Sequence, residues 1–205
     1  MTFEPSRPAT TRRALLAGGA ALCLALWANP GAALTQAEAS ALIGQLVSEI
    51  NTVINSGKPE AAMYRDFERI FTRYGDVPII ARSALGPDWR RATPAQQNAF
   101  VTAFSSYLAR KYGKRFREFI GGQIEVTGTR ETRTGILVTS VARLRGQSPF
   151  TVEWQVSNRS GQNKMFNLYI EGVNMLATER TEIGAMLDRR RGNIDQLITD
   201  LRSAG

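Results

Sequence analysis

Residues 150–171 read FTVEWQVSNRSGQNKMFNLYIE, and this stretch predicts two β-strands joined by a turn. Apolar side chains occupy every second position from Val152 to Val156 and again from Phe166 to Ile170. Ser, Gly and Asn residues, which favour turns, stand between the two runs. Because successive side chains of a strand point to opposite faces, each strand should bury one face and expose the other.

Two segments upstream have the same strand character, and helical patterns lie on both sides of the four strands. The predicted strands are Gln123–Arg130, Gly135–Leu144, Phe150–Asn158 and Lys164–Glu171. Their short connections indicate antiparallel pairing. Apolar spacing, capping boxes and Gly or Pro signals predict helices from Thr35 to before Gly57, Pro59–Tyr74, Val77–Leu85, Pro94 to before Gly121, Thr178–Asp188 and Asn193–Arg202. This order of helices, strands and helices predicts an α+β fold.

The first 33 residues have the pattern of an export signal. Arg12 and Arg13 precede the apolar run Ala14–Trp27, which small residues follow up to Ala33. The run is shorter than the roughly 20 apolar residues that cross a bilayer, so we predict a signal peptide over residues 1–33. The paired arginines are similar to a twin-arginine signal, with an ordinary secretory signal as the alternative. We expect a mature periplasmic chain, residues 34–205, that forms one domain.

Composition restricts the chemistry of the mature chain. The sequence of 205 residues has no histidine, and its one cysteine, Cys23, lies inside the predicted signal. The commonest general base and metal ligand is therefore missing, and neither a disulfide nor thiolate chemistry is expected after cleavage. We expect no metal and no organic cofactor. The formal charge of +8 favours anionic partners, such as a membrane surface or an acidic protein.

Two motifs carry a resemblance to a known family. The first runs from Leu85–Arg90 through Thr93–Phe100, and the second from Lys164–Phe166 through Ile170–Val173. With these motifs in this order behind an export signal, the chain resembles the MlaC family. Members of that family are the periplasmic phospholipid-binding components of the pathway that maintains outer-membrane lipid asymmetry.

Three positions depart from the usual pattern of the family. This chain has Asn163 where the family usually has tryptophan, Asn167 where it has aspartate, and Asn174 where it has serine. These differences concern the turn between the last strand and the following helix, so the sequence leaves the geometry of that turn open.

The resemblance implies a helical layer packed on a twisted, mainly antiparallel four-stranded sheet, with an apolar cavity between them that holds phospholipid acyl chains. It also implies docking to an inner-membrane transporter complex and to an outer-membrane lipoprotein complex. We expect a monomer that binds no nucleic acid, since export removes the chain from the cytoplasm. The residues predicted to contact the lipid are Phe67, Phe71, Phe104, Leu108, Trp154, Phe166, Leu168 and Ile170.

A cluster of basic residues near the end of the fourth helix has two interpretations. Arg110, Lys114 and Arg117 are candidates for docking to a partner or a membrane. Alternatively, they form a solvated helix end whose cations oppose the negative end of the helix dipole.

We expect the chain to carry phospholipid without catalysing a reaction. Two other functions are alternatives. An enzyme acting on an apolar substrate would need a carboxylate whose pKa burial raises, and the strands offer Glu125, Glu153 and Glu171. A periplasmic chaperone would hold apolar polypeptide segments in the same kind of cavity.

Overall fold

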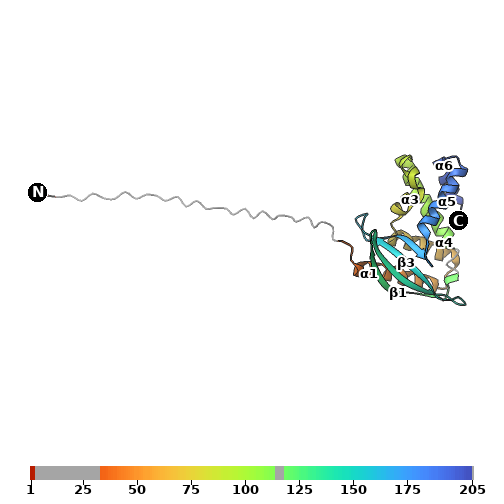
Figure 1. Ribbon diagram of the computed structural model, residues 1–205, viewed down its shortest axis with the longest axis horizontal. Helices are drawn as coiled ribbons and strands as arrows, with labels where there is room; N and C mark the ends of the chain where they lie inside the picture. Colours follow the sequence, from red (N-terminus) through yellow and green to blue (C-terminus); the bar gives the residue numbers. More distant parts are fainter. Residues whose placement is uncertain (3–32, 114–117, 205) are drawn as a thin grey trace. The chain divides into compact units, whose positions relative to one another are not determined.

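The computed structural model describes residues 1–2, 33–113 and 118–204 (Figure 1). The predicted signal peptide lies outside the described residues except for positions 1, 2 and 33. Within the described ranges, no helix has both the length and the apolar character needed to cross a membrane.

The α+β prediction is confirmed, with most boundaries close to those expected. The elements are α1 Gln36–Ile54, α2 Glu60–Tyr74, α3 Val77–Leu85, η1 Gly86–Arg90, α4 Pro94–Gly113, β1 Gln123–Thr132, β2 Gly135–Arg143, β3 Phe150–Ser157, β4 Lys164–Ile170, β5 Val173–Asn174, α5 Met175–Arg189 and α6 Ile194–Ser203. Strand order follows chain order from β1 to β5, and every neighbouring pair is antiparallel. The sheet thus has a fifth strand, two residues long, beyond the four predicted.

Both predicted capping boxes are present. Thr35 Oγ1 accepts from the Glu38 amide at 3.2 Å, and Glu38 Oε2 accepts from the Thr35 amide at 2.9 Å. The second box has the same reciprocal bonds between Thr93 and Gln96, at 3.0 and 3.2 Å. Each box satisfies amide groups that have no partner within the first turn of a helix, so it fixes where α1 and α4 begin.

The turn between β4 and β5 explains why the strand ends before Glu171. Glu171 has φ = 52° and Gly172 has φ = 77°. Positive φ at both central residues is the geometry of a tight type I′ hairpin. Glu171 is therefore an exposed turn residue and not the last residue of a strand as predicted.

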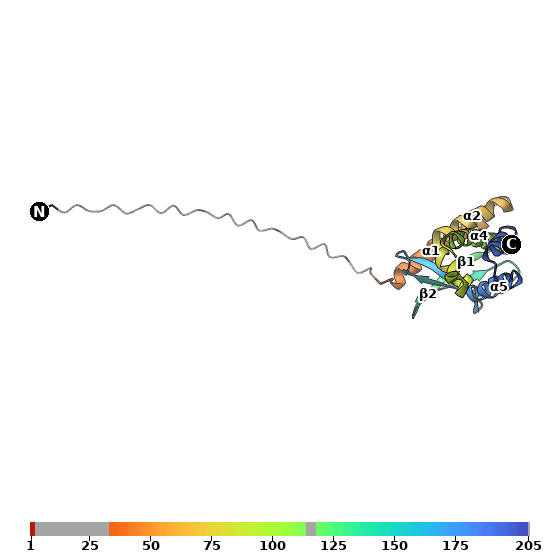
Figure 2. The same cartoon turned by 90° about the horizontal axis from the view of Figure 1, so that it is seen from above.

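The described domain has two hydrophobic cores. The first packs α1 and α2 against one face of the sheet, and the second joins α3, α4, α5 and α6. Figure 1 shows α3, α5 and α6 grouped beyond one side of the sheet, and Figure 2 shows α1 and α2 alongside it. Phe71 packs against both cores. The two cores therefore meet along a boundary to which α2 and β4 both contribute.

A bulge in β4 decides which side chain of the strand faces the first core. Gln155 pairs with Asn167, whereas the next residue of β3, Val156, pairs with Met165, so Phe166 has no partner. Met165 is buried in the first core, and Phe166 packs against the second. An extra residue in one strand re-aims the side chains beside it, so Met165 and not Phe166 shares the first core with Leu168.

Candidate functional site

An apolar cavity of about 200 Å³ lies where the two cores meet. Helices α1, α2, α4 and α5 and strands β1, β3 and β4 all contribute to its wall. Most of the lining side chains are aliphatic or aromatic, and the polar exceptions are concentrated at Asn167, Tyr112 and Glu179. An engineered cavity of about 150 Å³ with such a lining stays dry and takes up small apolar molecules. This cavity can therefore hold hydrocarbon without a compensating hydrogen bond.

Seven of the eight residues predicted to contact lipid lie in the cavity wall. They are Phe67, Phe71, Leu108, Trp154, Phe166, Leu168 and Ile170. Phe104 does not line the cavity, because its fully buried ring stacks on Phe100 at a centroid distance of 5.5 Å inside the second core. The apolar stripe of α4 reaches the cavity only one turn later, at Leu108.

Several lining residues were not predicted. Val152 lies on the same face of β3 as Trp154, so the alternation of that strand could have identified it. Met165 reaches the wall because of the bulge in β4. Met175 and Leu176 line the cavity because α5 begins at Met175 and not at Thr178 as predicted. Methionine side chains are flexible, so Met165 and Met175 can adapt the wall to an irregular ligand.

The unusual asparagines organise the junction between β4 and α5. Asn167 is 6% exposed, and its Oδ1 accepts from the amides of Leu168 at 2.8 Å and Leu176 at 3.1 Å. Its Nδ2 donates to Gln155 Oε1 at 3.3 Å. Asn174 caps α5 by accepting from the Ala177 amide at 3.0 Å. A capping serine or a buried aspartate could accept the same backbone bonds, so these substitutions keep the turn intact.

A network of charged and phenolic groups borders the cavity between α4 and α5. Lys111 Nζ donates to Glu179 Oε1 at 2.8 Å and to Glu182 Oε2 at 2.5 Å. Tyr112 donates its hydroxyl to Glu179 Oε1, and Tyr107 donates to Glu182 Oε1 at 2.6 Å. The ammonium of Lys111 also lies 5.4 and 5.6 Å from the centres of the two tyrosine rings, within the range of cation–π attraction.

This network fixes the charge of its members. Burial disfavours the charged form of Lys111, but hydrogen bonds to the two carboxylates outweigh burial and raise its pKa. Burial opposes ionisation of Glu182 as well, yet the bonds from Lys111 and Tyr107 lower its pKa. Burial, together with the bond to Glu182, raises the pKa of Tyr107. At neutral pH Lys111 is therefore a cation, Glu182 an anion and Tyr107 a neutral donor.

The strand carboxylates named as catalytic candidates lie away from the cavity. Glu125 and Glu171 are exposed, and Glu153 is half-buried with its Oε1 3.8 Å from the Arg130 guanidinium. Glu125, Glu153 and Glu171 are not lining residues. In the part of the chain that the structure describes, no group of three or more His, Cys, Asp or Glu side chains could hold a metal ion.

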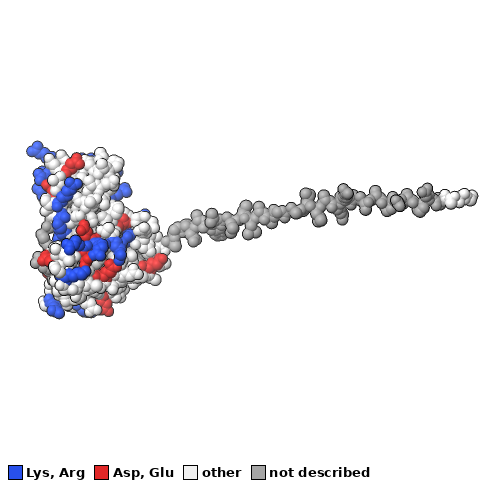
Figure 3. Space-filling model, turned by 180° about the vertical axis from the view of Figure 1, so that it is seen from behind, with Lys and Arg blue, Asp and Glu red and all other residues white. Residues whose placement is uncertain are grey.

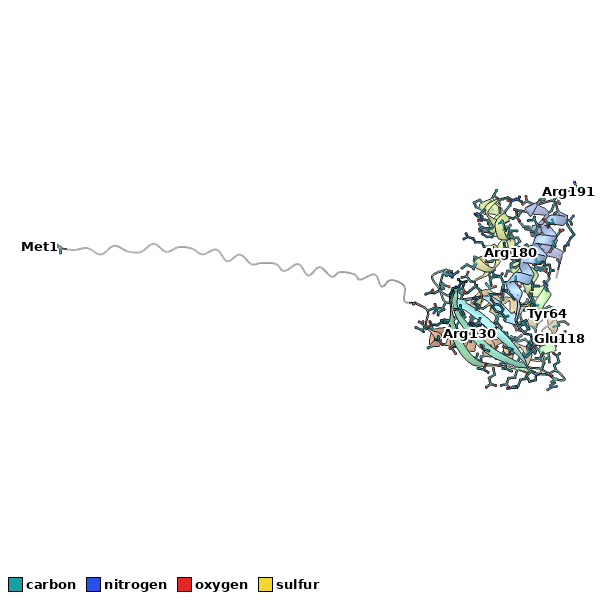
Figure 4. All side chains as sticks on the ribbon, in the orientation of Figure 1. Met1, Tyr64, Glu118, Arg130, Arg180 and Arg191 are labelled. Atoms are coloured by element: carbon teal, nitrogen blue, oxygen red, sulfur yellow. The ribbon has the colours of Figure 1, made fainter. Side chains whose placement is uncertain are left out.

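Of the three predicted docking cations, the structure describes Arg110. Its guanidinium donates to the carbonyls of Ala204 at 2.9 Å and Leu201 at 2.5 Å, so it binds the end of α6. Lys114 and Arg117 lie outside the described residues. Figure 3 shows basic side chains interspersed with acidic ones on the face in view, and Figure 4 shows Arg191 at the end of the helices remote from the sheet. Arg110 therefore has a structural partner that its sequence position did not reveal.

Comparisons with known proteins agree with this architecture. The family model described as MlaC protein matches residues 44–203. A curated relative from Haemophilus influenzae, the intermembrane phospholipid transport system binding protein MlaC, is 20% identical over 137 residues, which cover 64% of this chain. The chain spans 63% of the length of that relative.

A solved structure has the same fold. It is the phospholipid-binding protein from Ralstonia solanacearum in complex with a phospholipid, 20% identical, with a TM-score of 0.69. The match covers 80% of this chain and 95% of that one.

Proposed function

Because this chain belongs to the MlaC family, we propose that it is a periplasmic phospholipid carrier whose cavity holds acyl chain during transit between membranes. The observation that carries this proposal is the cavity between the two cores, with a wall that is almost wholly apolar. The phospholipid bound to the Ralstonia solanacearum protein of the same fold supports the choice of ligand.

The energetics of such a carrier follow from the apolar wall. Each methylene removed from water contributes about 0.8 kcal/mol, so about 14 methylenes of one acyl chain avoid roughly 11 kcal/mol of exposure. A bilayer shields the same methylenes from water, so the net free energy of moving a lipid from a membrane into the cavity is small. While the lipid crosses water, the cavity needs only to surround the acyl chain with apolar groups as well as a bilayer does. This requires apolar volume and no catalytic group.

The cavity must widen to accept a whole lipid. Its volume of about 200 Å³ is below the roughly 300–1,000 Å³ of common ligand pockets. Its position favours expansion, because its walls belong to two separately packed cores. The flexible side chains of Met165 and Met175 can change conformation as the wall widens.

We infer the cellular route from the predicted signal peptide and the family. The mature chain starts near Leu34 in the periplasm, receives lipid at one membrane and delivers it at the other. Its proposed partners are an inner-membrane transporter complex and an outer-membrane lipoprotein complex, which membership of the family suggests.

Extraction of the purified protein tests the ligand. The mature chain isolated from the periplasm should release phospholipid into organic solvent at about one molecule per chain, measured by mass spectrometry and phosphorus content. Bound peptides without phospholipid would favour the chaperone alternative and contradict the carrier. Transfer of labelled phospholipid between two vesicle populations should accelerate with added protein, and failure to accelerate would contradict the carrier function.

A further inference from the structure

One carboxylate stands out in the cavity wall. Glu179 lies on α5, is 3% exposed and contributes to the wall of the cavity. Its Oε1 accepts from both Lys111 and Tyr112. Its Oε2 is equally buried, and none of the described residues provides it with a hydrogen-bond donor. A buried carboxylate oxygen without a donor is unfavourable, so this atom is poised to accept a bond from a ligand.

The charges around Glu179 select the kind of donor. Lys111 serves two carboxylates, Glu179 and Glu182, so this group of three side chains has one negative charge in excess. The cavity has low polarity, which strengthens the attraction between this excess charge and a cation. A cationic donor therefore satisfies both the hydrogen bond and the charge.

The network also connects the cavity to solvent. The side chain of Glu179 is 4% exposed, that of Lys111 is 26% exposed and that of Glu182 is 43% exposed. Glu179 is thus the inner end of a short polar path from the surface to an apolar chamber. A lipid with an acyl chain in the chamber can bring the end of its head group to Glu179, where this path meets the chamber.

We propose that Glu179 Oε2 accepts a hydrogen bond from the primary ammonium of a phospholipid head group, so that the cavity prefers ethanolamine phospholipids. This inference rests on the proposed function and names the lipid class that the same site takes. A choline head group has the same charge but no N–H, so it cannot donate. A glycerol head group can donate a hydroxyl, but its lipid brings a net negative charge beside the excess carboxylate.

Lipid competition tests the proposal on the mature protein. The chain is incubated with vesicles that contain equal amounts of phosphatidylethanolamine, phosphatidylcholine and phosphatidylglycerol with identical acyl chains, and the bound lipids are then quantified by mass spectrometry. A hydrogen bond to a charged group predicts that the ethanolamine lipid is enriched about 10-fold or more over the choline lipid. Glu179→Gln, which keeps the shape and removes the charge, should reduce this enrichment to less than about 3-fold.

Glu182→Gln is the matched control. Glu182 bonds to the same lysine, but both of its oxygens have donors and it is not a lining residue. This variant should keep the preference for ethanolamine over choline lipid, because the two head groups carry the same charge and only N–H donation to Glu179 Oε2 separates them. An equal loss of preference in both variants would show that the charge of the whole network acts, and would overturn the assignment to Glu179 Oε2.

A series of ligands tests the same idea without any mutation. Ethanolamine lipids with one, two or three N-methyl groups keep the positive charge while the number of N–H donors falls to zero. The unmodified protein should retain binding through the dimethyl lipid and lose the preference at the trimethyl lipid. Equal binding across the series would overturn the proposal while leaving the carrier function intact. Absence of any bound phospholipid would instead contradict the proposed function itself.

Discussion

Trp154 donates its indole N–H to Ser140 Oγ at 2.8 Å across strands β2 and β3, and both side chains are buried. Ser140 in turn donates to the Val152 carbonyl at 3.0 Å. Trp154 is also a lining residue, so this bond satisfies its polar atom and leaves its apolar ring for the cavity. The serine is fully buried.

Replacement of Ser140 by alanine should destabilise the protein by about 1–3 kcal/mol, because the indole N–H would be left buried without an acceptor. Urea unfolding followed by tryptophan fluorescence measures the change. Thr139→Ala, at the neighbouring and less buried position of the same strand, should cost less than about 1 kcal/mol. Equal costs for the two variants would show that the indole bond contributes nothing specific.

Leu168→Glu and Ile170→Glu should each strip phospholipid from the purified protein. Both side chains line the cavity, and an unpaired carboxylate there must either protonate or bring in water, which removes apolar room. Lipid extraction and circular dichroism together measure the result. Val173→Glu is the control, because Val173 is 54% exposed on the adjoining strand β5, and this variant should keep its lipid. Folded Leu168 and Ile170 variants with a full complement of lipid would exclude this strand from the binding surface.

Loss of the cap of α5 should lower both the stability of the protein and the amount of phospholipid that it holds. Asn174→Ala removes the side-chain bond to the Ala177 amide and should cost about 1 kcal/mol, whereas Asn174→Ser should retain the cap. Asn193 caps α6 in the same manner, at 3.1 Å from the Gln196 amide. Asn193→Ala should cost a similar amount of stability but leave lipid content unchanged, because α5 contributes to the cavity wall and α6 does not. A matching loss of lipid in both variants would contradict this distinction.

Asp66 should give the protein a specific sensitivity to acid. Its Oδ2 accepts from Lys58 Nζ at 2.7 Å, and this bond lowers the pKa of Asp66 below its ordinary range even though burial opposes the shift. A lowered carboxyl pKa stabilises the fold above the ordinary pKa, and the contribution disappears as the pH falls through the folded value. The unfolding free energy of the protein minus that of Asp66→Asn should be constant above about pH 5 and decline below about pH 4. The difference should be less than about 1 kcal/mol, because Lys58 is half exposed. A difference that does not vary with pH would show that the charge of Asp66 is irrelevant.

The elements of the fold could be predicted because their signals are local. Alternation identified β3 and β4, and β-branched and aromatic residues between turn signals identified β1 and β2. The capping boxes at Thr35 and Thr93 fixed the starts of α1 and α4. The early start of α5 was missed because Met175–Ala177 has no periodic pattern of its own. Its helical conformation depends on the cap at Asn174 and on the bond from the Leu176 amide to the side-chain Oδ1 of Asn167, which lies on another element.

The cavity wall was predictable only in part, because core and cavity residues have the same periodicity. Phe104 and Leu108 lie one turn apart on the same face of α4, and only packing against the second core separates their surroundings. Alternation in β4 could not reveal the bulge, since the register with β3 decides which side chains face inward. Glu179 did leave a signal, because it stands four residues before the buried Ile183, on the apolar stripe of α5. A charged residue in such a stripe is a reason to look for a function.

The cavity between the two cores also determines how the protein responds to compression. Its space of about 200 Å³ exists in the folded chain and disappears when the chain unfolds into water. Unfolding therefore reduces the total volume, and hydrostatic pressure favours the state with the smaller volume. A hydrocarbon chain in the cavity would occupy this space and remove much of the difference. The protein should therefore unfold at a lower pressure when its cavity is empty than when a hydrocarbon chain fills it.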